Sequence, residues 1–340
     1  MKKSVFLVLV LVLVVTGVFA GGGAAQSGSA AQQKKVVIQI GLENNPGEPV
    51  TDGVYEWKRL AEARSGGSME IQVFPSSQLG TKDQIIDMML AGMEVVTLAD
   101  GSFFADRGAP DTGITYGPYF FASWDEAFNL VNSDWWAQQG KILEGKGLKL
   151  LASNWVYGER HTLTKRPIRT VEDFRGLKLR VPTNNVQVKG TEVMGASPTP
   201  LPLGDVYIAL QQGVVDGVEN PLTVLYGGKF HEVAKYLTLD GHIKVLTTWF
   251  TGTIFWNTLS REHQNILIET GKEAGLYNNR LQEKATEEVI NKFKAEGIEI
   301  INVDIAAFQA QARTFYELPE FKTLWSPNII EATNRAKSGR

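Results

Sequence analysis

Strand-like and helix-like segments alternate along the first third of the chain, and this order constrains the fold more than any other sequence feature. Residues 36–42, VVIQIGL, form an apolar run typical of a strand. Residues 52–64 place their apolar side chains at helical spacing, and residues 69–75, MEIQVFP, alternate as a second strand should. A second amphipathic helix is predicted over residues 83–91. The pattern indicates an α/β fold in which helices cover mixed sheets.

The length of the chain favours two domains over one. A chain of 340 residues exceeds what a single hydrophobic core usually serves. Its hydrophobic fraction of 43% is that of a globular protein. The formal charge of −3 gives no basic field for a nucleic acid, so nucleic-acid partners are not predicted.

The N-terminus carries an export signal. Lys2 and Lys3 precede an apolar run over residues 5–20 that ends in Val18-Phe19-Ala20, with small residues where signal peptidase cleaves. The run is shorter than the roughly 20 residues that span a bilayer. We therefore predict a signal peptide over residues 1–20, with cleavage after Ala20 or at another position, a flexible leader over residues 21–35 and a periplasmic location; an uncleaved anchor is the less favoured alternative.

Cysteine is absent from the sequence, which limits both the chemistry that the chain can carry out and the ways in which its fold can be stabilised. Disulfides, a lipid anchor on cysteine and thiolate metal sites are excluded. The four histidines lack metal-ligand spacing, and no nucleophile elbow or dinucleotide motif occurs. We predict no metal, no cofactor and no enzyme activity. A secreted hydrolase or lyase stays an alternative, because the separation of two catalytic carboxylates depends on the fold.

Two segments repeat one pattern. Residues 83–100 and 205–220 each begin with an acidic residue and continue as an amphipathic helix, a glycine and an apolar strand with a polar tip. Asp100 and Asn220 occupy the corresponding strand ends. Ligands of open α/β sheets bind beyond the carboxyl ends of strands. We expect both side chains at one cleft.

Two arginines are candidates for binding a carboxylate. In residues 174–183, FRGLKLRVPT, Leu177, Leu179 and Val181 alternate as the buried face of a strand, which places Arg180 on the opposite face. Arg160 lies in a second alternating stretch, GERHTLT. A guanidinium holds a carboxylate through two parallel hydrogen bonds. Each arginine could instead be a surface residue or part of a structural ion pair.

Three segments together resemble a known family. FPSSQLG, GLKLRVP and PTPLPLGDVYIALQQGVVDGVENPL are similar, in order and spacing, to the DctP-type solute-binding subunit of tripartite ATP-independent periplasmic (TRAP) transporters. The resemblance implies a two-lobed, type II-like periplasmic-binding-protein fold with two mixed sheets, a long connecting helix and a ligand cleft. It places lobe I at 36–157 plus 246–285, and lobe II at 158–245 plus 286–340.

The resemblance also implies roles for particular residues. The near-invariant arginine of the family corresponds to Arg180, which would clamp a ligand carboxylate, and a second arginine common among sugar-acid binders corresponds to Arg160. The cleft asparagine corresponds to Asn220. Glu43 and Asp100 correspond to polar and acidic cleft positions.

The far end of the pocket is less defined. Leu203 stands where some sugar-acid binders carry an aromatic ring, which puts a stacking contact in doubt. Asn154 and Trp155 are further candidates for contact with the ligand. Tyr157, Trp249 and Trp256 could also supply aromatic walls, although all four aromatic residues suit a core position as well.

The function implied by the resemblance is that of a receptor. It would bind a small organic carboxylate and deliver it to one small and one large integral-membrane subunit, whose transport is driven by an ion gradient. Because Glu43 and Asp100 would repel a second carboxylate but accept hydrogen bonds from hydroxyls, a uronate or aldonate is favoured over a C4-dicarboxylate. An amino acid or aromatic acid stays an alternative, as does service to an ATP-driven importer. No oligomer interface is indicated, so a monomer is expected.

Overall fold

The computed structural model describes residues 35–339. The predicted signal peptide and nearly all of the predicted leader lie outside these residues. Among the described residues, no helix is both long and apolar enough to cross a membrane.

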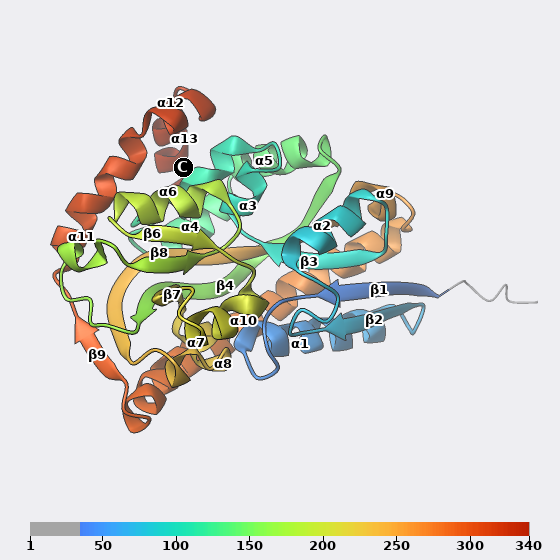
Figure 1. Ribbon diagram of the computed structural model, residues 1–340. Coiled ribbons are helices and arrows are strands. Elements are labelled where there is room, and N and C mark those ends of the chain that lie inside the picture. Colours follow the sequence, from blue (N-terminus) through green and yellow to red (C-terminus); the bar gives the residue numbers. More distant parts are fainter. Residues whose placement is uncertain (1–34, 340) are drawn as a thin grey trace, which may run out of the picture. The chain divides into compact units, whose positions relative to one another are not determined.

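Nine strands of the described part of the chain form one hydrogen-bonded sheet (Figure 1). The strands are β1 (Val36–Gly41), β2 (Met69–Phe74), β3 (Val95–Ala99), β4 (Leu148–Thr164), β5 (Lys178–Val181), β6 (Ser197–Pro200), β7 (Gly217–Pro221), β8 (Tyr236–Gly252) and β9 (Glu299–Asn302). Their order is β2-β1-β3-β8-β4-β7-β5-β6, with β9 also paired to β8.

Two parallel groups of strands are joined by two long antiparallel strands. β1 pairs in parallel with β2 and β3, and β5 pairs in parallel with β6 and β7. The 17-residue strands β4 and β8 pair with each other and connect the groups. The predicted sheets therefore share these strands. The predicted lobe boundaries fall inside β4, β8 and the long helix, and the division into lobes stays a prediction.

The α-helices alternate with the strands or follow them. They are α1 (Pro49–Arg64), α2 (Lys82–Leu90), α3 (Gly101–Ala105), α4 (Trp124–Val131), α5 (Asp134–Glu144), α6 (Asn185–Val193), α7 (Val206–Gln211), α8 (Leu222–Gly227), α9 (Thr253–Trp256), α10 (Arg261–Ala295), α11 (Ile305–Ala312), α12 (Pro319–Leu324) and α13 (Ile329–Lys337). Short 3₁₀ turns are η1 (Pro110–Tyr116), η2 (Val171–Phe174), η3 (Leu203–Asp205), η4 (Phe230–Glu232) and η5 (Arg313–Glu317).

The core forms on both faces of β3 because its side chains alternate. Val96 and Leu98 pack with α1 and α10, whereas Val95 and Ala99 pack in a second cluster with α2 and α3. Strands that are buried on both faces are typical of parallel sheets covered by helices. This packing fixes the carboxyl end of β3, where Asp100 follows.

The 35-residue helix α10 packs closely against α1 and β4 (Figure 1). A side chain at Gly275 would lie 2.8 Å from the Trp155 ring, and one at Gly271 would lie 2.9 Å from the Trp57 ring. The helix continues through both glycines, and their role is to let α10 approach the tryptophans.

Candidate functional site

A cavity lies where the carboxyl ends of the two parallel groups of strands meet. Glu43 and Asp100 come from the ends of β1 and β3, and Arg180 and Asn220 come from β5 and β7. The cavity holds about 640 Å³ of unfilled space, part of it open to solvent. Asp100 and Asn220, which end the two segments with the repeated sequence pattern, both line this cavity. This is the position at which open α/β sheets bind ligands.

Arg180 is a buried cation without an ion-pair partner in the described residues. The residue is 2% exposed, and its Nε and Nη2 donate to the carbonyl oxygen of Leu201 at 2.9 and 2.6 Å. No carboxylate oxygen of residues 35–339 lies within 4.0 Å of its guanidinium. Burial lowers the pKa of Arg180 to about 10, although Glu43 and Glu219 oppose the shift. The group is therefore charged at neutral pH and buried without a counter-charge among residues 35–339.

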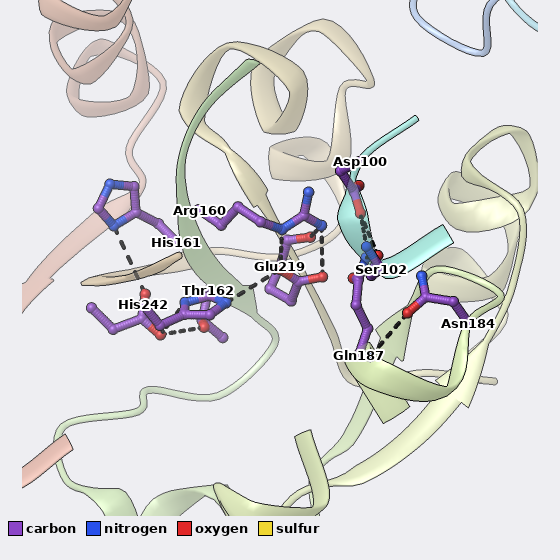
Figure 2. A network of polar contacts seen from close by, with 10 residues as sticks. Asp100, Ser102, Arg160, His161, Thr162, Asn184, Gln187, Glu219 and His242 are labelled. Carbon is purple, nitrogen blue, oxygen red and sulfur yellow. Dashed lines mark hydrogen bonds and ion pairs between the residues drawn. The ribbon is translucent and has the colours of Figure 1, made fainter. Parts of the chain in front are cut away.

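Arg160 also lines the cavity, but its charge is already paired (Figure 2). Its Nε and Nη2 donate to the carboxylate of Glu219, with Nη2 2.7 Å from Oε1, and Nη2 donates to the Glu219 carbonyl oxygen at 2.8 Å. Each residue is 3% exposed. Burial alone would raise the pKa of Glu219, but Arg160 holds it at about 2. Burial likewise opposes a raised pKa of Arg160, and Glu219 overrides it. The structural ion pair considered from the sequence is therefore present.

The ion pair continues into a buried histidine. Nε2 of His242 lies 3.2 Å from Oε2 of Glu219, and its Nδ1 lies 3.2 Å from Oδ2 of Asp240. Thr162 donates to the same Asp240 oxygen at 2.6 Å. Burial would lower the pKa of His242, but the two carboxylates raise it to about 9. Figure 2 shows Arg160, Glu219 and His242 in one chain of contacts. Opposite charges therefore alternate along this chain.

Acidic and amide groups complete the cavity. Glu43 accepts a hydrogen bond from the backbone N–H of Leu203 at 3.2 Å. Asp100 caps α3 by accepting from the backbone N–H of Ser102 at 2.9 Å and from its hydroxyl, and burial raises its pKa. Oδ1 of Asn220 is buried and has no donor among residues 35–339. These oxygens can accept hydrogen bonds from hydroxyl groups of a ligand.

Two of the predicted ligand contacts lie elsewhere. The Trp155 ring packs against Trp57 and Trp249, and its Nε1 donates to the Gly271 carbonyl at 2.8 Å. Asn154 donates to the Lys272 carbonyl at 2.8 Å. Neither lines the cavity, because this stretch of β4 lies against α10.

Among the other candidates for the far end of the pocket, two line the cavity. Leu203 lies there as expected, and Tyr157 is the member of the predicted aromatic set that does. Trp249 belongs to the tryptophan cluster, and Trp256 is buried in the same core. The core role considered for the three tryptophans is the one that the structure shows.

Several lining residues were not predicted from the sequence. They include Lys82 at the start of α2, Phe103 in α3, Tyr116 in η1 and Asn44 after β1. Lys82 lies two residues after the family segment FPSSQLG, and that position was the signal that could have identified it.

A buried carboxylate supports the rim of the cavity. Glu48 is 3% exposed, and its carboxylate accepts from Nδ2 of Asn44 at 2.7 Å and from the backbone N–H of Asn45 at 3.0 Å. Nδ2 of Asn44 also donates to the hydroxyl oxygen of Tyr157 at 3.0 Å. No cation of the described residues lies within ion-pair distance of Glu48. Burial therefore raises the pKa of Glu48 to about 7.

Because the pKa of Glu48 is raised in the folded state, ionisation of this carboxyl lowers the stability of the fold increasingly as pH rises. A carboxyl whose pKa rises from 4.5 unfolded to about 7 folded binds more protons in the folded state, so stability falls as pH rises between these values. We expect the effect of Glu48→Gln on the free energy of unfolding to be more favourable at pH 8.5 than at pH 4.5 by about 3 kcal/mol, because the amide has no charge to bury. Urea unfolding at both values measures this difference. The exposed Glu287→Gln is the control, and an equal effect of Glu48→Gln at both pH values would contradict the prediction.

Comparison with known proteins agrees with this architecture. The family model for bacterial extracellular solute-binding protein, family 7 (DctP) matches residues 40–322. A TRAP periplasmic solute-binding protein from Ochrobacterium anthropi, solved with bound L-fuconate, is 40% identical, with a TM-score of 0.85 over 90% of this chain and 99% of that one. A second from Actinobacillus succinogenes 130z, with bound L-galactonate, is 34% identical, with a TM-score of 0.85 over 90% and 100%.

A third structure carries a different ligand. The TRAP solute-binding protein from Fusobacterium nucleatum with bound sn-glycerol 3-phosphate is 29% identical, with a TM-score of 0.84 over 89% of this chain and 97% of that one. The family match covers most of the chain, and the fold is that expected for such a receptor. The chain therefore belongs to the DctP family of extracellular solute-binding proteins, the solute receptors of TRAP transporters.

Proposed function

We propose that the protein binds a small organic monocarboxylate, and that Arg180 clamps its carboxylate group. The observation that carries this proposal is a buried guanidinium without a carboxylate partner among residues 35–339. A buried charge is costly unless it is paired. A ligand carboxylate supplies the missing partner through charge-assisted hydrogen bonds.

A sugar acid, either a uronate or an aldonate, suits the rest of the cavity. Glu43, Asp100 and the unpartnered Oδ1 of Asn220 offer acceptors for hydroxyl hydrogens. The same carboxylates would repel the second acid group of a C4-dicarboxylate. Two of the structures that resemble this chain hold L-fuconate and L-galactonate, which supports the assignment.

The protein would act as a receptor that releases its ligand unchanged. In this proposal it works in the periplasm as a monomer and delivers the cargo to the small and large integral-membrane subunits of a TRAP transporter. An enzyme on the same scaffold would convert the ligand instead. Recovery of chemically unchanged ligand after hours of incubation separates the two possibilities.

A thermal-shift screen tests the cargo class. The panel contains uronates, aldonates, C4-dicarboxylates, amino acids, aromatic acids and sn-glycerol 3-phosphate, added to protein freed of co-purified ligand. A ligand at a thousandfold excess over its Kd stabilises the folded state by about 4 kcal/mol. We expect stabilisation by sugar acids that Arg180→Ala abolishes. Stabilisation confined to another class, or stabilisation that survives in Arg180→Ala, would overturn the proposal.

A further inference from the structure

Beside Arg180, Lys82 presents to the cavity a second cation without an ion-pair partner among residues 35–339, and its backbone is fixed. The residue begins α2 directly after the cap residue Thr81. Thr81 and Gln84 form a reciprocal capping box: the Thr81 hydroxyl accepts from the Gln84 N–H at 3.3 Å, and the Gln84 side chain accepts from the Thr81 N–H at 2.9 Å. Nζ of Lys82 lies 4.3 Å from the centre of the Phe103 ring, which is itself buried.

The ammonium of Lys82 lacks a protein acceptor. Within residues 35–339 its Nζ makes no hydrogen bond and no ion pair, although an ammonium carries three donors. Burial lowers the pKa of Lys82, and the carboxylates of Glu43 and Asp100, which line the same cavity, oppose that shift. The residue is half-buried, so its ammonium loses part of its hydration, and the cation–π contact offsets only part of that loss. Lys82 lines the same cavity as Arg180.

The charges of the cavity indicate what these donors bind. Apart from the Arg160–Glu219 pair and the Asp83–Arg107 pair, the formal charges of Lys82 and Arg180 cancel those of Glu43 and Asp100. One carboxylate on Arg180 then leaves a single excess negative charge, whereas a dianion leaves two. A hydroxyl group adds no charge. Its oxygen can accept from an ammonium while its hydrogen is donated to a carboxylate.

We propose that Lys82 is a specificity-determining residue that binds a hydroxyl oxygen of the cargo, with Asp100 or Glu43 accepting the hydrogen of that hydroxyl. The receptor thereby selects polyhydroxylated monocarboxylates over acids without hydroxyls and over dianions. This inference rests on the proposed function, because it takes the cargo carboxylate to lie on Arg180.

Calorimetric titration of the full mature chain tests this role. The probes are L-galactonate and L-fuconate as polyhydroxylated acids, hexanoate as an acid without hydroxyls, and sn-glycerol 3-phosphate as a dianion. Hydrogen bonds to a charged group contribute enough that Lys82→Met should weaken binding of the polyhydroxylated acids at least about tenfold. Lys82→Gln, which keeps a neutral donor, should lose less. The exposed Lys178→Met on β5 is the matched control and should bind as the wild type does.

The outcomes separate this inference from the proposed function. If Arg180→Ala binds every probe as the wild type does, the carboxylate clamp is wrong. If Arg180→Ala loses binding while Lys82→Met stays within about threefold of the wild type for both sugar acids, the clamp stands and the role of Lys82 is wrong. Loss in Lys82→Met confined to sn-glycerol 3-phosphate would show that Lys82 binds a phosphate and would overturn the hydroxyl assignment. Unchanged unfolding of Lys82→Met in urea confirms that losses arise at the site.

Discussion

Replacing Arg180 with alanine is expected to weaken cargo binding at least about thirtyfold. Removing one partner of a buried, hydrogen-bonded charge pair costs roughly 2–5 kcal/mol, which corresponds to about thirtyfold to several thousandfold in affinity. Arg180 is 2% exposed and has no carboxylate partner in the described chain, so the cargo supplies its counter-charge in this proposal. Calorimetric titration with L-galactonate measures the loss. Binding within about threefold of the wild type would remove the clamp assignment.

Two further variants separate the clamp from a structural role. Arg180→Lys keeps the charge but loses the planar fork, and we expect it to bind poorly as well. The exposed Arg175→Ala, five residues earlier, is the control for loss of a positive charge and should bind normally. Because an unpaired buried guanidinium is costly, Arg180→Ala without ligand should be at least as stable as the wild type in urea.

Part of this site could be predicted from the sequence because strand alternation and strand ends are local features. Leu179 and Val181 place Arg180 on the other face of β5, and the structure buries that arginine in the cavity. Asp100 and Asn220 end corresponding strands, and both line the same cavity. These inferences required only side-chain periodicity and the rule that ligands lie at the carboxyl ends of strands.

The partners of the predicted residues could not be derived in this way. Glu219 meets Arg160 because strands β4 and β7 pair in the register that sets Thr162 opposite Glu219. The sequence of neither strand specifies this register. Trp155 was uncertain for a related reason. An aromatic residue on a strand suits a cavity wall or a core equally well, and the position of α10 decides which.

The joining of all the strands into one sheet also could not be predicted from local sequence patterns. Both β4 and β8 are 17 residues long, and their antiparallel pairing joins the two predicted mixed sheets into one. The register shifts along the β4–β8 pair keep the long strands from pairing as one regular ladder. Such irregularities depend on what packs on each side and leave little trace in sequence periodicity.

The buried charges of Arg160, Glu219 and His242 stabilise the fold less at both low and high pH. The pKa of Glu219 falls from 4.5 to about 2, so its contribution to stability is present above pH 4.5 and is lost as pH falls through about 2. The pKa of His242 rises from 6.5 to about 9, so its contribution is present below pH 6.5 and is lost as pH rises through about 9. The two contributions are both complete between about pH 4.5 and 6.5.

Glu219→Gln is expected to lower the free energy of unfolding at pH 6 by about 3–5 kcal/mol. The change keeps the shape of the side chain but leaves the guanidinium of Arg160 buried without its counter-charge, which is the costly way to disrupt a buried pair. His242 loses one of its two carboxylates at the same time, so its pKa should fall below the present value of about 9. Urea unfolding and the NMR titration of the His242 ring measure the two effects.

The double variant Arg160→Met/Glu219→Leu removes both charges and should recover most of the lost stability, because well-packed apolar residues replace a buried pair at little cost. If the single variant lost less than about 1 kcal/mol, or the double variant were the less stable of the two, Arg160 would not depend on Glu219 for its burial.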